Sequence, residues 1–190
     1  NTYEITSATT LVDSAFVGPT FSGASPLGGP LPQNVNTVAQ YDVKFKLGNE
    51  GGLTAGSSTI TLTFPSNTLV PTSIIPAFIT VNGTAVATSP VCNASLRTVT
   101  ITVPVGATGI SANDTVQIDI STGGLIQNPS LSGTYRLEVL TSIEATNFPS
   151  RLYTILPAST TVDAATVVAV PSTFGVNAQY RVDFSTGSQG

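Results

Sequence analysis

Apolar and polar residues alternate with a period of two along several short stretches of the chain. Within Thr59–Phe64, Ile60 and Leu62 stand between threonines, and similar alternation recurs in Thr98–Val103 and Thr115–Ile120. Because successive side chains of a β-strand point to opposite faces, this period places the apolar residues on one face. No helical period extends over more than about one turn. The pattern therefore predicts short strands, each with one buried face.

Turn-forming residues separate the predicted strands. Asn82-Gly83 predicts a tight hairpin, because both central residues of a type I′ turn need positive φ. Pro65, Pro71 and Pro76 predict a crossing connection, since proline interrupts a strand. This order of elements predicts an all-β fold, an Ig-like antiparallel β-sandwich of about 7–8 strands. The predicted strands are Val38–Leu47, Thr59–Phe64, Ala77–Val81, Thr84–Thr88, Thr98–Val103, Thr115–Ile120, Tyr135–Leu140 and Leu152–Leu156.

One strand sequence occurs twice. Ala39–Phe45 reads Ala-Gln-Tyr-Asp-Val-Lys-Phe, and Ala178–Phe184 reads Ala-Gln-Tyr-Arg-Val-Asp-Phe. The shared apolar residues fall at alternate positions, as one face of a strand requires. The positions between them exchange the signs of their charges, and we expect these to face solvent. They are Asp42 and Lys44 in the first copy, and Arg181 and Asp183 in the second.

A second pair of similar segments lies outside the first pair. Tyr3–Ile5 and the Val-Asp pair that follows it match Tyr153–Ile155 and the Val-Asp pair that follows there. This second pair is offset by 150 residues and the first by 139, so the connector before Ala39 is 11 residues longer than the one before Ala178. A period this long predicts self-sufficient domains in tandem.

The repeats predict one complete domain between two partial ones. We expect 1–35 to be the tail of a preceding repeat with a Gly/Pro-rich connector, 36–157 to be the β-sandwich, and 158–190 to be a connector with the first strand of the next repeat. The end strands would lack partners within this chain, and unpaired edges favour strand addition. The sequence therefore predicts an assembly site at the repeat ends, formed by Tyr3, Ile5, Tyr180, Val182 and Phe184.

The composition narrows the class of protein. Charged residues make up 8 % of the chain, against about 25 % in ordinary domains, so Ser, Thr, Asn and Gln supply the surface polarity, as in many secreted and cell-surface β-proteins. A net charge of −4 with six Lys and Arg residues argues against nucleic acid and anionic membrane as partners. The chain has no apolar stretch of about 18 residues, so no membrane span is predicted. The chain contains no methionine, and we expect a processed product or an excised fragment.

No catalytic residue is predicted, and we expect that the protein is not an enzyme. The chain has no histidine, which is the commonest general base and metal ligand. Cys92 has no imidazole partner, and we expect either a small buried side chain or a free surface thiol. No serine lies in a Gly-x-Ser-x-Gly elbow. Asp114 and Asp119 are predicted on a turn and on a strand, where nothing makes them an acid–base pair.

Two other kinds of site are alternatives to ordinary surface residues. An isopeptide bond would join a strand lysine to an asparagine, but Lys44 and Lys46 are expected to face solvent. A calcium ion would need six to eight oxygen ligands. Asp13 and Asp163 lie at the expected junctions and Glu50 in the loop after Val38–Leu47, without forming a dense acidic loop. No cofactor or metal is therefore predicted, and calcium stays the alternative.

The second function class that the sequence leaves open is a ligand-binding adhesin or a carbohydrate-binding module. Such a module needs aromatic and polar side chains in its loops, whereas the loops 65–76 and 123–133 carry aliphatic residues and serines. Glycan binding is left open. N-glycosylation patterns occur at Asn82, Asn93 and Asn113, and the sequence does not decide whether they are occupied.

Several short motifs follow one another in a fixed order: Tyr41-x-Val43-x-Phe45, Gly52–Gly56, Ile60–Pro65, Val81–Gly83, Gly124–Pro129, Gly133–Tyr135 and Thr141-Ser142. Their order and spacing resemble tandem Ig-like repeats of large bacterial cell-surface and S-layer-type proteins. The resemblance covers most of the chain and implies a secreted structural array without catalytic residues. The resulting prediction is a non-catalytic module of an extracellular surface array, stalk or filament. It would assemble with copies of itself, or with neighbouring repeats, through edge-strand and end-to-end contacts.

Overall fold

The prediction of an all-β fold is confirmed. The computed structural model describes residues 13–17, 29–158 and 165–186, and within these residues it contains strands and short 3₁₀ turns but no α-helix. The chain divides into two compact units, Asn1–Leu156 and Pro157–Gly190. The first unit holds the sandwich, and the second holds a single β-hairpin.

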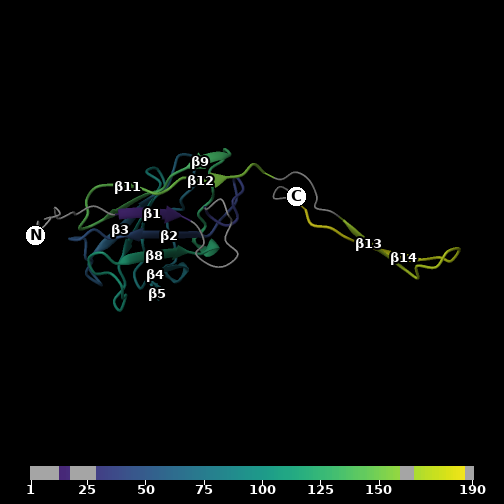
Figure 1. The fold of residues 1–190 in the computed structure, drawn as a ribbon, viewed down its shortest axis with the longest axis horizontal. Coiled ribbons are helices and arrows are strands. Elements are labelled where there is room, and N and C mark those ends of the chain that lie inside the picture. Colours follow the sequence, from purple (N-terminus) through teal and green to yellow (C-terminus); the bar gives the residue numbers. More distant parts are fainter. Residues whose placement is uncertain (1–12, 18–28, 159–164, 187–190) are drawn as a thin grey trace, which may run out of the picture. The chain divides into compact units, whose positions relative to one another are not determined.

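The first unit contains two five-stranded antiparallel sheets (Figure 1). The first sheet has the order β1 (Asp13–Val17), β2 (Tyr41–Lys46), β8 (Thr115–Ile120), β4 (Ile79–Val81) and β5 (Thr84–Ala85). The second has the order β11 (Phe148–Pro149), β10 (Glu138–Thr141), β3 (Thr59–Thr63), β7 (Thr98–Thr102) and β6 (Val91–Asn93). The remaining elements are the pair β12 (Tyr153–Ile155) and β9 (Gly133–Tyr135), and the 3₁₀ turns η1 (Pro76–Phe78) and η2 (Thr122–Gly124).

The core lies between the two sheets and follows the alternating pattern of the sequence. Every second residue of β2, β3, β7 and β8 is fully buried. At one end of the core, the rings of Tyr41 and Phe64 meet edge to face, with centroids 5.1 Å apart. Burying one such side chain contributes about 1.5–3 kcal/mol. The largest buried apolar side chains in the sheets include Tyr41, Phe45, Ile60, Leu62, Ile79, Ile101, Ile118 and Ile120.

Threonines occupy the outer face of the second sheet. The three threonines of β3 pair in register with the three of β7, and all six are half-buried. The hydroxyl oxygens of Thr61 and Thr100 lie 2.9 Å apart across the two strands. Cross-strand threonine pairs stabilise a sheet. The outer face of this sheet can therefore meet solvent although it carries few charges.

The hairpin turn at Asn82-Gly83 has the predicted conformation. The φ angles of the two residues are 47° and 76°, as a type I′ turn requires. The Asn82 side chain also fixes a neighbouring loop, because its Nδ2 donates to the carbonyls of Thr108 and Gly109. Its Oδ1 accepts a hydrogen bond from the backbone N–H of Gln117. The turn is therefore tied to both β8 and the loop before it.

The first part of the chain takes more part in the sandwich than the sequence indicated. Residues 13–17 were expected to belong to a repeat tail or connector, yet β1 pairs with β2 along the edge of the first sheet. Further on, Leu31 exchanges backbone hydrogen bonds with Gln40, and Val35 is buried and donates to the Leu156 carbonyl. Alternation could not predict these contacts, because Asp13–Val17 does not alternate and the later contacts are made mainly by backbone groups in a Gly/Pro-rich stretch.

The predicted strand Tyr135–Leu140 is in fact two strands. Gly133–Tyr135 pairs with β12, whereas Glu138–Thr141 pairs with β3. Ser150 stabilises the break, because its backbone and side chain bond to Leu137 and its carbonyl accepts from Arg136. Leu137 and Val139 are both fully buried, so the alternation continues across the break and hides it.

Other predicted strands differ in extent. Ala77–Val81 begins at Ile79 because η1 precedes it, and Thr84–Thr88 ends at Ala85. The short strands β6 and β11 were not predicted. The 65–76 stretch forms a connection, as predicted, with an isolated bridge between Leu69 and Gln127.

One predicted solvent position is wrong. Asp42 lies on the outer face of β2, but its side chain is buried, while Lys44 is half-buried. Asp42 stands directly opposite Asp119 of β8, and Asp119 accepts hydrogen bonds from Gln117 and Thr80. The sequence pattern assigned a face to this carboxylate but not its burial, which depends on tertiary packing.

Candidate assembly site

The second unit contains an antiparallel hairpin of β13 (Thr166–Val170) and β14 (Gln179–Asp183). β14 is the strand that the repeated sequence predicted, whereas β13 was not predicted. The two strands form a sheet of their own, and no third strand pairs with either of them among the described residues. A two-stranded hairpin alone is at best marginally stable in water.

The hairpin exposes apolar side chains that its sequence counterpart buries. Tyr180, Val182 and Phe184 are 69 %, 51 % and 58 % exposed. The corresponding residues of the sandwich, in the order of the repeat, are Tyr41, Val43 and Phe45, and none of them is more than 1 % exposed. The apolar side chains of the repeated strand are therefore buried in the first unit and exposed in the second.

The pairing of β13 with β14 repeats the pairing of β1 with β2. In the sandwich, Phe16 stands opposite Lys44 and Val17 opposite Val43. Adding the two sequence offsets, 150 for the first strand and 139 for the second, gives the hairpin pairs Thr166–Asp183 and Val167–Val182. Both pairs are present in the hairpin, in the same antiparallel register.

This agreement locates the length difference between the repeats. Because the register of the two strands is the same in both pairs, the 11 additional residues of the first copy fall in the connection from β1 to β2. In the hairpin, the connection from Val170 to Gln179 is a short loop with Gly175 at positive φ. The two pairs of similar sequence segments therefore correspond to two strand pairs with the same register.

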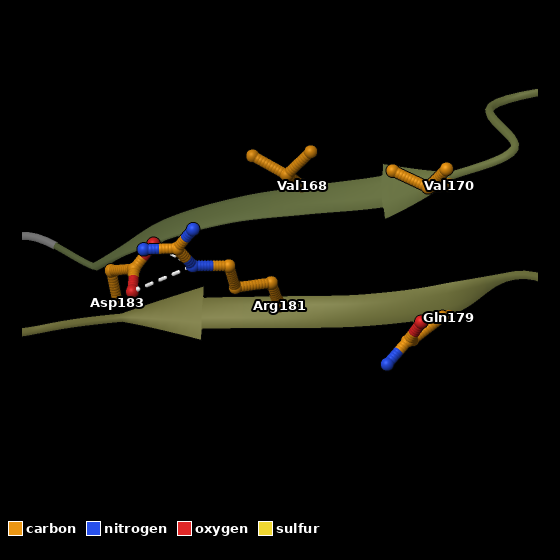
Figure 2. Close-up of a pocket in the computed structure, with 5 residues that line it drawn as sticks. All are labelled: Val168, Val170, Gln179, Arg181 and Asp183. Atoms are coloured by element: carbon orange, nitrogen blue, oxygen red, sulfur yellow. Dashed lines mark hydrogen bonds and ion pairs between the residues drawn. The ribbon is translucent and has the colours of Figure 1, made fainter.

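The other face of the hairpin combines apolar and charged groups. Figure 2 shows Val168 and Val170 on β13 above Gln179, Arg181 and Asp183 on β14. Arg181 Nε lies 3.0 Å from an Asp183 carboxylate oxygen, and the Arg181 side chain is largely exposed while that of Asp183 is half exposed. An exposed ion pair of this kind contributes little stability, so it leaves the guanidinium available to a further partner.

In the sandwich, the equivalent strand β2 has a buried tyrosine whose hydroxyl is part of a hydrogen-bond network. The Tyr41 hydroxyl donates a 2.8 Å hydrogen bond to Asn128 Oδ1, and Asn128 Nδ2 donates to the carbonyls of Pro32 and Asn34. Burial, with a smaller contribution from Tyr153, raises the pKa of Tyr41 well above its ordinary value, so the hydroxyl stays a donor. Asn128 was predicted only as a loop residue. Its Asn-Pro context indicated a turn and gave no sign of this buried network.

A buried carboxyl at the end of the sandwich was also not predicted. Glu144 is fully buried, and its Oε1 accepts a 2.7 Å hydrogen bond from the Gly48 N–H. Gly51 packs so closely on this carboxyl that a Cβ there would lie 2.4 Å from Glu144 Cδ. Desolvation raises the pKa of Glu144, and the Gly48 N–H offsets part of that effect. The group fixes the loop after β2 to the loop after β10.

The remaining predicted residues do not form a second site in the described part of the chain. Tyr3, Ile5 and Asp163 lie outside the described residues, and no group of three or more metal-ligating side chains occurs among those that are described. Glu50 is exposed. The part of the chain that the structure describes contains no helix able to span a membrane.

The side chains weighed for covalent chemistry have ordinary strand surroundings. Lys44 and Lys46 are half-buried, and the β8 residues opposite them are Gln117 and Thr115, neither of them an asparagine. Cys92 is half-buried, and burial raises the pKa of its thiol. The Nδ2 atom of Asn82, the acceptor atom in N-glycosylation, already donates two hydrogen bonds.

Comparisons with known proteins leave the class of protein to be argued from the fold. No protein-family model matches the chain, and no curated protein matches it. Among solved structures, the chain is similar to the crystal structure of BslA, a bacterial hydrophobin. The TM-score is 0.43, with 15 % identity over 76 % of this chain and 98 % of that one. A similarity this low carries no argument about function.

Proposed function

We propose that the protein is a non-catalytic structural repeat module of an extracellular surface array, stalk or filament. The observation that carries the proposal is the shared register of β13–β14 and β1–β2, because it gives the hairpin the form of the first two strands of a further sandwich. Its partners are accordingly neighbouring repeats or copies of itself. The low charge and the Ser/Thr-rich composition support an extracellular location.

The mechanism of such a module is mechanical. β2 is paired with β8 over six successive residue pairs and with β1 on its other edge. Strands that are hydrogen-bonded on both edges separate only when many bonds break together. The segment between the sandwich and the hairpin sets the reach from one unit to the next. A chain of such units would carry tension through its sandwiches.

The experiment is to complete the second unit with the protein's own strands. In the extended chain, residues 1–184 are followed directly by residues 46–157 of a second copy, so that Phe184 takes the place of Phe45. We expect a second cooperative sandwich to fold. The amides of 179–184 occur only once in this chain, and their hydrogen exchange should slow by orders of magnitude relative to the 1–190 chain.

A matched control separates folding of the second unit from general compaction. Val182→Asp in the extended chain places a carboxylate at a position equivalent to the fully buried Val43, so it should abolish the protection of 179–184. The same substitution in the 1–190 chain should leave the first sandwich unchanged. An extended chain whose added residues exchange as fast as an unfolded segment would overturn the proposed function.

A further inference from the structure

Among the described residues, no strand pairs with the outer edge of β14, called the free edge here, whereas the corresponding edge of β2 in the sandwich is paired. β2 accepts β8 on this edge, with Tyr41 opposite Ile120, Val43 opposite Ile118 and Phe45 opposite Val116. The hairpin already reproduces the other edge of β2 in register. The residues along the free edge of β14 therefore match a partner strand with the apolar alternation of β8.

The charged positions between the apolar ones make this edge different from that of β2. In the sandwich, Asp42 stands opposite Asp119, so two carboxylates face each other across the strand pair. Like charges in this position destabilise a sheet. In the hairpin, the position of Asp42 is taken by Arg181. A β8-type strand would bring its carboxylate opposite a guanidinium instead.

Arg181 has the hydrogen-bonding capacity for this contact. Its Nε bonds to Asp183 at 3.1 Å, and the side chain is otherwise exposed. A guanidinium carries five N–H donors in a planar fork, so it can serve a second carboxylate beside the first. The position opposite Asp183 would be that of Gln117, which is uncharged and brings no repulsion.

We infer that the free edge of β14 binds an antiparallel strand of the β8 type, in the register of β2 with β8, and that Arg181 pairs with the acidic residue at the position of Asp119. This inference rests on the proposed function and adds to it the partner strand, its register and the charge that selects it. Apolar alternation supplies the buried face, and the ion pair discriminates against strands shifted along the edge.

The test is a charge-exchange cycle in the extended chain described above, with substitutions in the added copy written as added-copy Asp119 or Gln117. Arg181→Asp should speed the exchange of the 179–184 amides about 2- to 10-fold, because an attraction becomes a repulsion. Added-copy Asp119→Arg should do the same. The two together should restore exchange to near the starting rate, as a direct pair requires.

A register control uses added-copy Gln117→Arg in combination with Arg181→Asp. This places the new cation two residues along the same strand face, so it should restore less protection than added-copy Asp119→Arg. Additive effects of the two charge exchanges, or equal rescue from position 117, would overturn the inference while the second sandwich still folds. Failure of the added residues to fold at all is a different result, which counts against the proposed function itself.

Discussion

Tyrosine 41 and tyrosine 180 are the same residue of a repeated strand in two different surroundings. Tyr41 is fully buried and donates to Asn128, whereas Tyr180 is mostly exposed. The Tyr41 hydroxyl therefore combines burial with a hydrogen bond, and the Tyr180 side chain lacks that burial. The pair offers a comparison within a single chain, because the chemistry of the substitution is identical at both positions.

Removing the two hydroxyl groups should have unequal effects. Tyr41→Phe leaves Asn128 Oδ1 buried without its donor, which should lower the free energy of unfolding by about 1–3 kcal/mol. Tyr180→Phe should change it by less than about 0.5 kcal/mol. Urea unfolding of both variants and the unsubstituted chain measures the difference. Equal effects at the two positions would show that the Asn128 network does not stabilise the sandwich.

The buried carboxyl of Glu144 gives the sandwich a specific pH dependence. Because burial raises its folded-state pKa, its contribution to stability is greatest below the unfolded pKa and is lost as the pH rises through the folded value. Glu144→Gln keeps an acceptor for the Gly48 N–H without the charge. The variant should therefore gain stability over the unsubstituted protein as the pH rises from 4 to 8. Thermal unfolding across this range measures the gap, and a gap that stayed constant or narrowed would contradict the prediction.

At the scale of elements, the turns and long alternating strands are well determined by local sequence. Positive φ at Asn82 and Gly83 agrees with the turn expected there. The strands β3, β7 and β8 match their predicted ranges within one residue. The strand β11 was missed because two residues carry no period, and β1 was missed because Asp13–Val17 does not alternate between apolar and polar residues.

The Asn82 side chain should be as important as the turn that it forms. Asn82→Asp keeps an acceptor for the Gln117 N–H, but it replaces the donor that faces the Thr108 and Gly109 carbonyls. Loss of these bonds and repulsion from the carbonyls should cost about 1–3 kcal/mol. Thermal unfolding measures this cost.

A control residue for this substitution lies in another exposed turn. Asn67 also has positive φ, but its side chain makes no hydrogen bond among the described residues. Asn67→Asp should therefore shift stability by less than about 0.5 kcal/mol. A loss of similar size at both positions would mean that the charge, rather than the lost bonds, explains the effect of Asn82→Asp.

For the whole molecule, the sequence predicted the class of fold and the repeated strand, but not the partner of that strand. The Ala-Gln-Tyr repeat located β14, since a seven-residue match with alternating identity is visible without coordinates. β13 was missed because Thr166–Val170 has apolar residues on both faces and no alternation. The predicted domain limits and the end-strand residues Tyr3 and Ile5 stay predictions.

An exposed hairpin face should cause self-association of the 1–190 chain. Val167 and Val182 stand opposite each other and are both more than half exposed, and exposed apolar faces beside open strand edges promote association. Val182→Lys should lower the mean mass measured by light scattering at high protein concentration. Val105→Lys, at an exposed apolar residue of the first unit, should leave it unchanged. A monomer at every concentration before substitution would contradict this expectation.

The shared register also has a practical consequence for protein engineering. Two copies of one strand pair differ by 11 residues in the loop that joins them and still align residue for residue. The same register is therefore compatible with connections of two different lengths. Under the proposed function, the connection between β1 and β2 is therefore the position at which a foreign peptide or an affinity tag would be inserted with the strand alignment unchanged.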